Sequence, residues 1–83
     1  MDNRMNAIKD KYKVGNRVKF QPSSTKYPKT CLGIIIKMNP KRAKIKVYVG
    51  DSLGIWMVPY LHLDHITTKH EITLLTIGKM QNP

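Results

Sequence analysis

The clearest pattern of apolar and polar positions runs through residues 42–49, where the two kinds of side chain alternate. One set of alternate positions is aliphatic: Ala43, Ile45, Val47 and Val49. The other set is basic and ends in a tyrosine: Arg42, Lys44, Lys46 and Tyr48. Because successive side chains of a β-strand point to opposite faces, this pattern predicts a strand with its aliphatic face buried and its cations in solvent.

Other short segments of the chain also predict strands. Residues 17–20 alternate cationic and apolar side chains, and residues 31–38 are rich in β-branched residues. Residues 55–58, 64–68 and 71–77 are further candidates. Gly33 predicts a bulge, which would let Ile35 and Met38 both point inward despite their odd separation. The expected core consists of Val18, Phe20, Ile35, Met38, Ile45, Val47 and Val58.

Turn-forming residues separate these segments. A polar loop spans residues 21–30, turns span residues 39–42 and 50–54, and residues 59–63 fit a single 3₁₀ turn. Residues 1–12 predict an N-terminal extension, either a short helix or disordered, and residues 79–83 a tail. Short strands at regular spacing, without helix–strand alternation, predict an all-β domain over residues 13–78, built as a small antiparallel barrel or sandwich with an extra C-terminal strand.

The order of these segments resembles that of the SH3-like small barrels that include the KOW and Tudor-like groups. The resemblance spans residues 13–66 and rests on "VGNRVKF", a polar loop, "GIIIKMNPKRAKIKV", a glycine turn and "WMVPYLHL". Within it, Gly33-x-Ile35-x-x-Met38 is similar to the glycine and spaced apolar positions of a KOW motif. The resemblance implies a five-stranded barrel with a short 3₁₀ turn, and a module that binds RNA, DNA or proteins.

The charge of the chain points to a polyanionic partner. Fifteen Lys and Arg residues against five Asp and Glu give a net charge of +10, and all of the excess lies in residues 1–60. A small basic domain attracts nucleic acid, the commonest polyanion in a cell. The expected nucleic-acid-binding cations are Arg17, Lys19, Lys26, Lys29, Lys37, Lys41, Arg42, Lys44 and Lys46. Tyr27 and Tyr48 are the candidate stacking residues.

These residues predict a non-catalytic protein that binds the phosphate backbone with low sequence specificity, DNA being favoured and RNA an open alternative. Single and double strands are not separated by the sequence. The same cations could instead form a plain solvated face, or meet an acidic protein. The alternative function is a protein-interaction module that docks on transcription or translation machinery. The strand at residues 71–77 would then serve for docking, or would pair with its own copy in a weak homodimer. Trp56 fits either the core or an exposed stacking surface.

Other classes of function find little support in the sequence. His62, His65 and His70, with Asp64 and Cys31, match no strong zinc-ligand spacing, so no metal is expected. The chain has no glycine-rich phosphate loop and few acids, which argues against an enzyme and against a cofactor. No apolar run approaches the ~20 residues needed to span a bilayer, so no membrane partner is expected. The lone cysteine and the polar N-terminus predict a cytoplasmic protein, nucleoid-associated in a bacterial or phage setting.

Overall fold

The computed structural model describes residues 7–22, 30–50 and 53–81 of the 83-residue chain. A short helical stretch at residues 7–9 precedes the first strand. The elements that follow are β1 (Arg17–Phe20), β2 (Cys31–Met38), β3 (Arg42–Val49), β4 (Gly54–Pro59), the 3₁₀ turn η1 (Tyr60–His62), β5 (Asp64–His65) and the helix α2 (Lys69–Gln81).

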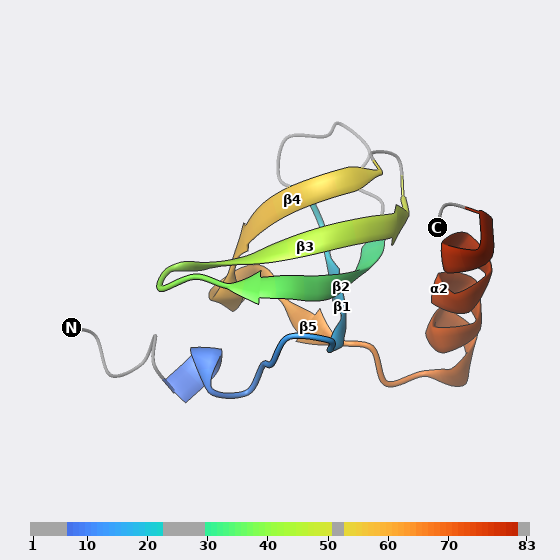
Figure 1. The fold of residues 1–83 in the computed structure, drawn as a ribbon. Helices are drawn as coiled ribbons and strands as arrows, with labels where there is room; N and C mark the ends of the chain where they lie inside the picture. Colours follow the sequence, from blue (N-terminus) through green and yellow to red (C-terminus); the bar gives the residue numbers. More distant parts are fainter. Residues whose placement is uncertain (1–6, 23–29, 51–52, 82–83) are drawn as a thin grey trace.

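The five strands form one antiparallel sheet in the order β4-β3-β2-β1-β5 (Figure 1). The predicted β-rich architecture and the 3₁₀ turn after β4 are therefore confirmed. The sheet is not closed, because β4 and β5 are its two edges and no pairing joins them within the described residues. The closed barrel expected from the sequence is thus not confirmed, and the structure supports the coarser statement of an open five-stranded sheet.

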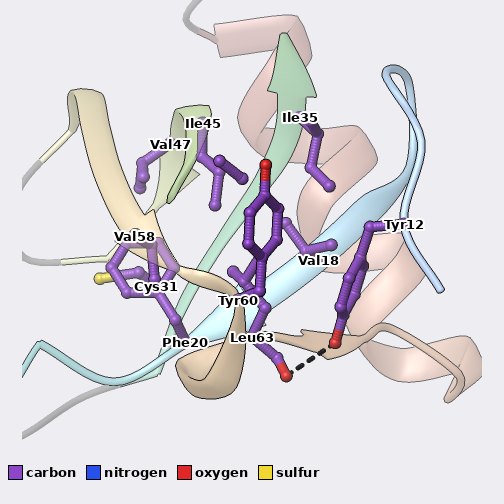
Figure 2. Close-up of a cluster of buried hydrophobic side chains, with 11 residues drawn as sticks. Tyr12, Val18, Phe20, Cys31, Ile35, Ile45, Val47, Val58, Tyr60 and Leu63 are labelled. Atoms are coloured by element: carbon purple, nitrogen blue, oxygen red, sulfur yellow. Dashed lines mark hydrogen bonds between the residues drawn. The ribbon is translucent and has the colours of Figure 1, made fainter. Parts of the chain in front are cut away.

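One face of the sheet, with η1 and the N-terminal segment, encloses the main core (Figure 2). Six of the seven side chains expected there are buried, and the seventh, Met38, is partly buried against them. The register of β2 against β3 shifts between Leu32 and Gly33 and again between Ile35 and Lys37. The second shift is the bulge that brings Ile35 and Met38 to the same side. Ile35 and Met38 thus point to the same side as predicted, but the bulge responsible lies between Ile35 and Lys37, whereas the sequence placed it at Gly33.

Two tyrosines that were not expected in the core are buried there, and their hydroxyls donate hydrogen bonds to backbone carbonyls at its edges. Tyr60 is fully buried, and its hydroxyl donates to the backbone carbonyls of Asn39 and Arg42 in the turn between β2 and β3. The hydroxyl of Tyr12 donates to the carbonyl of Leu63, 2.8 Å away (Figure 2). Burial raises the pKa of both phenols. The N-terminal segment is thus part of the core at residue 12 rather than a separate extension.

The C-terminal segment differs from the prediction. Residues 71–77, expected to form an extra strand, lie within α2, which continues to Gln81 and so passes the boundary expected at residue 78. Thr68 begins this helix: its hydroxyl accepts a hydrogen bond from the backbone N–H of Glu71 and donates to the Glu71 carboxylate, 2.8 Å away. The hydrogen bond from the Glu71 N–H to the Thr68 hydroxyl is one of the two bonds of a capping box. The Glu71 carboxylate accepts from the Thr68 hydroxyl as its second contact. The prediction of a C-terminal strand is therefore wrong, and the homodimer expected to pair through that strand loses the strand on which it was based.

The helix α2 packs on the face of the sheet opposite the main core, at one end of the strands (Figure 1). Leu75 is buried there with Leu32 and Ile66, and partly buried side chains from β2, β3 and α2 surround them. A Cβ built on Gly78 would lie 2.7 Å from the carbonyl oxygen of Tyr48, so this glycine lets helix and strand approach closely. Of the described helices, none is long and apolar enough to cross a membrane.

Candidate nucleic-acid interface

The surface of interest is the part of the sheet that faces away from the main core and is not covered by α2. We call it the outer face. In β3 the burial alternates as predicted: Ala43, Ile45 and Val47 are buried, whereas the basic residues between them reach this opposite side. Val49, expected among the buried set, packs instead against the cluster under α2. The pleat of β3 therefore places its cations together, as the sequence predicted.

The strand register shows what lies beside each of these cations. Directly paired residues of neighbouring strands share a face, so the partners of an outward lysine also point outward. Lys46 lies between Ile34 of β2 and Ile55 of β4. Lys44 lies between Lys37 and Met57, again one residue from each neighbour. Cations and apolar side chains are thus interleaved across the outer face.

Two of the cations face one another, and neither is paired with an acidic residue of the described part of the chain. Lys37 and Lys44 are directly opposite in the ladder, an arrangement that destabilises a sheet through like-charge repulsion. Residues 7–22, 30–50 and 53–81 contain a single ion pair, between Lys19 and Glu71, which leaves these two lysines without a carboxylate within ion-pair distance in that part of the chain. A bound polyanion would relieve this repulsion.

Lys19 departs from the expected pattern because a carboxylate neutralises it. Its Nζ atom lies 3.0 Å from Oε2 of Glu71 on α2, and the two side chains are partly buried, at 30% and 18% exposed. The hydroxyl of Thr68, followed by the Lys19 ammonium, holds the pKa of Glu71 below its ordinary value. Of the two cations of β1, Arg17 is therefore the one available to the basic surface. It is exposed and pairs with Ile34.

The aromatic residues occupy different places. Tyr48 is partly buried against the cluster under α2, and the ammonium of Lys46 lies 5.3 Å from the centre of its ring. The ring expected to stack on a base is thus already in contact with the helix cluster and one lysine. Trp56 points inward: it is half-buried against the main core, with its ring centre 5.6 Å from that of Phe20. Tyr27 lies outside the described residues.

The remaining predicted cations divide into two groups. Lys41 and Arg42 are exposed at the turn between β2 and β3, and Arg42 pairs with Pro59 at the end of β4. Together with Asn39, Pro40 and Met57 they line a shallow hollow of about 470 Å³ whose surface is mainly apolar. Lys26 and Lys29 belong to the loop at 23–29, outside the described residues.

Two exposed apolar side chains on this surface were not identified from the sequence. Ile55 and Met57 are 53% and 44% exposed on β4, although both belong to a strand. The alternation of residues 55–58 places them opposite Trp56 and Val58, but only the ladder between β3 and β4 sets them beside the lysines. Their position therefore follows from the register, which the sequence pattern did not reveal.

The histidines do not gather into a metal centre in the described part of the chain. His65 interacts with the carbonyl of Lys11 at 2.7 Å and stacks on Tyr12 with ring centres 4.6 Å apart. No group of three His, Cys, Asp or Glu residues able to hold a metal ion occurs among the described residues. Cys31 is buried in the main core.

Comparisons of the chain with models of protein families, with curated proteins and with solved structures find no match.

Proposed function

We propose that this protein binds nucleic acid, without catalysis, through the outer face of its sheet, and that it contacts mainly the phosphate backbone. DNA is the favoured ligand. The cations that would make the contacts are Arg17, Lys37, Lys41, Arg42, Lys44 and Lys46, with Lys26 and Lys29, outside the described residues, as further candidates. Because phosphate contacts carry no sequence information, low sequence specificity and strong salt dependence are expected.

The observation that carries this proposal is the row formed by Arg42, Lys44 and Lys46 along β3, with Lys37 directly opposite Lys44. Alternate side chains along a strand repeat every ~6.7 Å, so the row presents regularly spaced positive charge. The net charge of +10 adds a long-range attraction for any polyanion. An ordinary solvated face would normally mix acids among such bases.

We further propose that the fold is a variant of the SH3-like barrel of the KOW or Tudor-like type. Support comes from the pairing of β1 with both β2 and β5, from the bulge in β2 and from the 3₁₀ turn between β4 and β5. The helix α2 has no counterpart in the minimal barrel. In domains of this kind a binding role is more usual than catalysis, which agrees with the proposed function.

The test is a salt titration of binding to random-sequence DNA and RNA, followed by fluorescence anisotropy. The wild type should bind with a log–log salt slope of several units. Replacing Lys44→Glu and Lys46→Glu together should lower the affinity at least ten-fold. The slope should also fall by about 1.4 on a single strand, the value for two phosphate contacts.

The matched control is the pair Lys11→Glu and Lys13→Glu. Both residues are exposed and precede β1, and the change in net charge is the same as in the β3 variant. If binding depends on the outer face, the control should retain most of the affinity. Equal losses in the two variants would show that net charge alone attracts nucleic acid, and salt-independent or absent binding in the wild type would refute the proposal.

A second candidate function is docking on a protein partner through α2. Leu74, Ile77 and Met80 are 37%, 47% and 78% exposed on this helix and lie on the side turned away from the sheet. This observation favours a protein contact independent of the basic face. A partner captured from a lysate should then be retained by the Lys44→Glu, Lys46→Glu variant and lost by a Leu74→Gln, Ile77→Gln variant.

A further inference from the structure

The outer face repeats one arrangement, a cation beside an apolar side chain, and binding by charge alone would not require the apolar member. Along β3 and β4, every outward cation is directly opposite an apolar residue: Lys46 faces Ile55, Lys44 faces Met57 and Arg42 faces Pro59. The two strands run about 4.8 Å apart, so a line of positive charge and a line of apolar surface lie side by side.

The apolar line is accessible to a ligand. Ile55 and Met57 are among the exposed large hydrophobic side chains of the protein, and Pro59 is half-buried. The line ends at the hollow of about 470 Å³ where Met57 meets Lys41 and Arg42. Cationic and apolar side chains are therefore adjacent along the whole path from the middle of β3 back to the turn that precedes this strand.

This repeat matches the chemistry of a single nucleic-acid strand. Each nucleotide of such a strand has one phosphate and one base whose face is free, and each step of the paired strands offers one cation and one apolar side chain. A duplex keeps the faces of its bases stacked inside, so it would bring charged backbone against Ile55 and Met57 and leave their apolar surface without a partner.

We infer that the outer face prefers single-stranded nucleic acid, whose phosphates follow Arg42, Lys44 and Lys46 while its bases contact Ile55, Met57 and the hollow beside them. The inference rests on the proposed function and adds the class of ligand to it. Three such steps predict a short footprint of roughly three to four nucleotides per molecule, at the lower limit of the ~4–16 nucleotides that one OB-fold module binds.

The first experiment uses the wild-type protein and needs no variant. Its affinity is measured by anisotropy for an oligo-dT strand, for an abasic strand of the same length and for a hairpin duplex of matched phosphate number. The preference for free bases predicts binding to oligo-dT about ten-fold tighter than to either of the other probes. Equal affinity for all three, or tighter binding of the duplex, would overturn the single-strand preference while leaving phosphate binding intact.

The second experiment removes the apolar line without changing charge. Replacing Ile55→Thr and Met57→Thr keeps residues that suit a strand, so oligo-dT binding should fall to the level of the abasic probe while the salt slope stays unchanged. Met80→Gln, which removes an even more exposed apolar side chain on α2, is the control and should bind oligo-dT as the wild type does. If the double Thr variant still prefers oligo-dT to the abasic strand, Ile55 and Met57 do not contact the bases. Salt-independent or absent binding of the wild type to every probe would instead refute the proposed function.

Discussion

The ammonium of Lys19 on β1 lies 3.0 Å from the carboxylate of Glu71 on α2, and this pair joins the first strand of the sheet to the C-terminal helix. The contact spans 52 positions of the sequence and is partly shielded from solvent. It has two consequences. It neutralises one cation expected at the nucleic-acid interface, and it fixes the first turn of α2 beside β1.

The first prediction concerns the pH dependence of stability. The pKa of Glu71 is lower in the folded protein than its ordinary value of 4.5, because Thr68 and Lys19 favour the ionised form. The folded state then holds the charge more strongly than the unfolded state does. The resulting stabilisation is complete above pH 4.5 and is lost as the pH falls through the lower pKa of the folded state.

Glu71→Gln should therefore unfold at lower urea concentration than the wild type at neutral pH, and the gap should close as the pH falls below about 4.5. Asp10→Asn, which removes the same charge at an exposed acid before β1, is the control and should leave the urea midpoint at neutral pH close to that of the wild type. A gap between Glu71→Gln and the wild type that stays constant down to pH 3 would contradict this account.

The second prediction concerns Gly78, where two effects compete. In an exposed helix position, alanine is more favourable than glycine by about 1 kcal/mol. At Gly78, however, a Cβ would meet the carbonyl oxygen of Tyr48 and Cγ2 of Val49, each at 2.7 Å. The backbone of β3 has little freedom to move, so Gly78→Ala should lower the free energy of unfolding, by about 1–3 kcal/mol.

Thr76→Ala is the matched control for this change. Thr76 is exposed on the same helix, so alanine there should leave stability unchanged or raise it by up to about 0.5 kcal/mol. Urea unfolding followed by far-ultraviolet circular dichroism measures both variants. Stabilisation by Gly78→Ala similar to that by Thr76→Ala would show that α2 does not pack closely on β3 in solution.

The strands could be predicted from the sequence because most of them have a local pattern of apolar and polar positions, and in β1 to β4 one set of the apolar positions is buried. The alternation in residues 42–49 requires one face in the core, and Gly33 allows the close approach of β2 to β3: a Cβ there would lie 2.5 Å from the carbonyl of Lys46. The inward position of Trp56 follows in the same way from that of Val58.

The helix α2 was missed because two local signals disagree. Ile72, Thr73, Thr76 and Ile77 are β-branched and favour a strand by propensity. The opposite signal was present in Thr68-x-x-Glu71, a capping box, and in the separation of three residues between Ile72 and Leu75. Packing of Leu75 against Leu32 and Ile66 decides in favour of the helix, and such contacts between distant segments are not visible in a local pattern.

The candidate site was predicted only in part, for a related reason. The outward direction of Lys44 and Lys46 depends on the pleat of one strand, which the sequence reveals. Their neighbours depend on the register between strands: Ile55 and Met57 reach the lysines through the ladder of β4, and Glu71 reaches Lys19 through the position of α2. Register and docking arise from the whole fold rather than from any one segment.

The last prediction separates binding from folding at the pair Lys37 and Lys44. These two lysines are directly opposite in the ladder, so Lys44→Glu replaces a repulsive cross-strand pair with an attractive one. The free energy of unfolding should rise by about 0.2–1 kcal/mol at low salt, and the gain should shrink as salt screens the pair. Affinity for nucleic acid should fall at the same time, because a phosphate contact is lost.

The same substitution at the opposite lysine provides the control. Lys37→Glu should stabilise the fold by a similar amount, whereas the double variant Lys37→Glu, Lys44→Glu places two acids opposite each other and should lose the gain. Urea unfolding of the four proteins at low and high salt gives the coupling energy, and anisotropy with oligo-dT gives the affinity. A gain in stability with a loss of binding in each single variant would show that the outer face keeps a repulsive arrangement that serves the ligand. Binding that falls only in variants that also unfold more easily would mean that the lysines act through the fold.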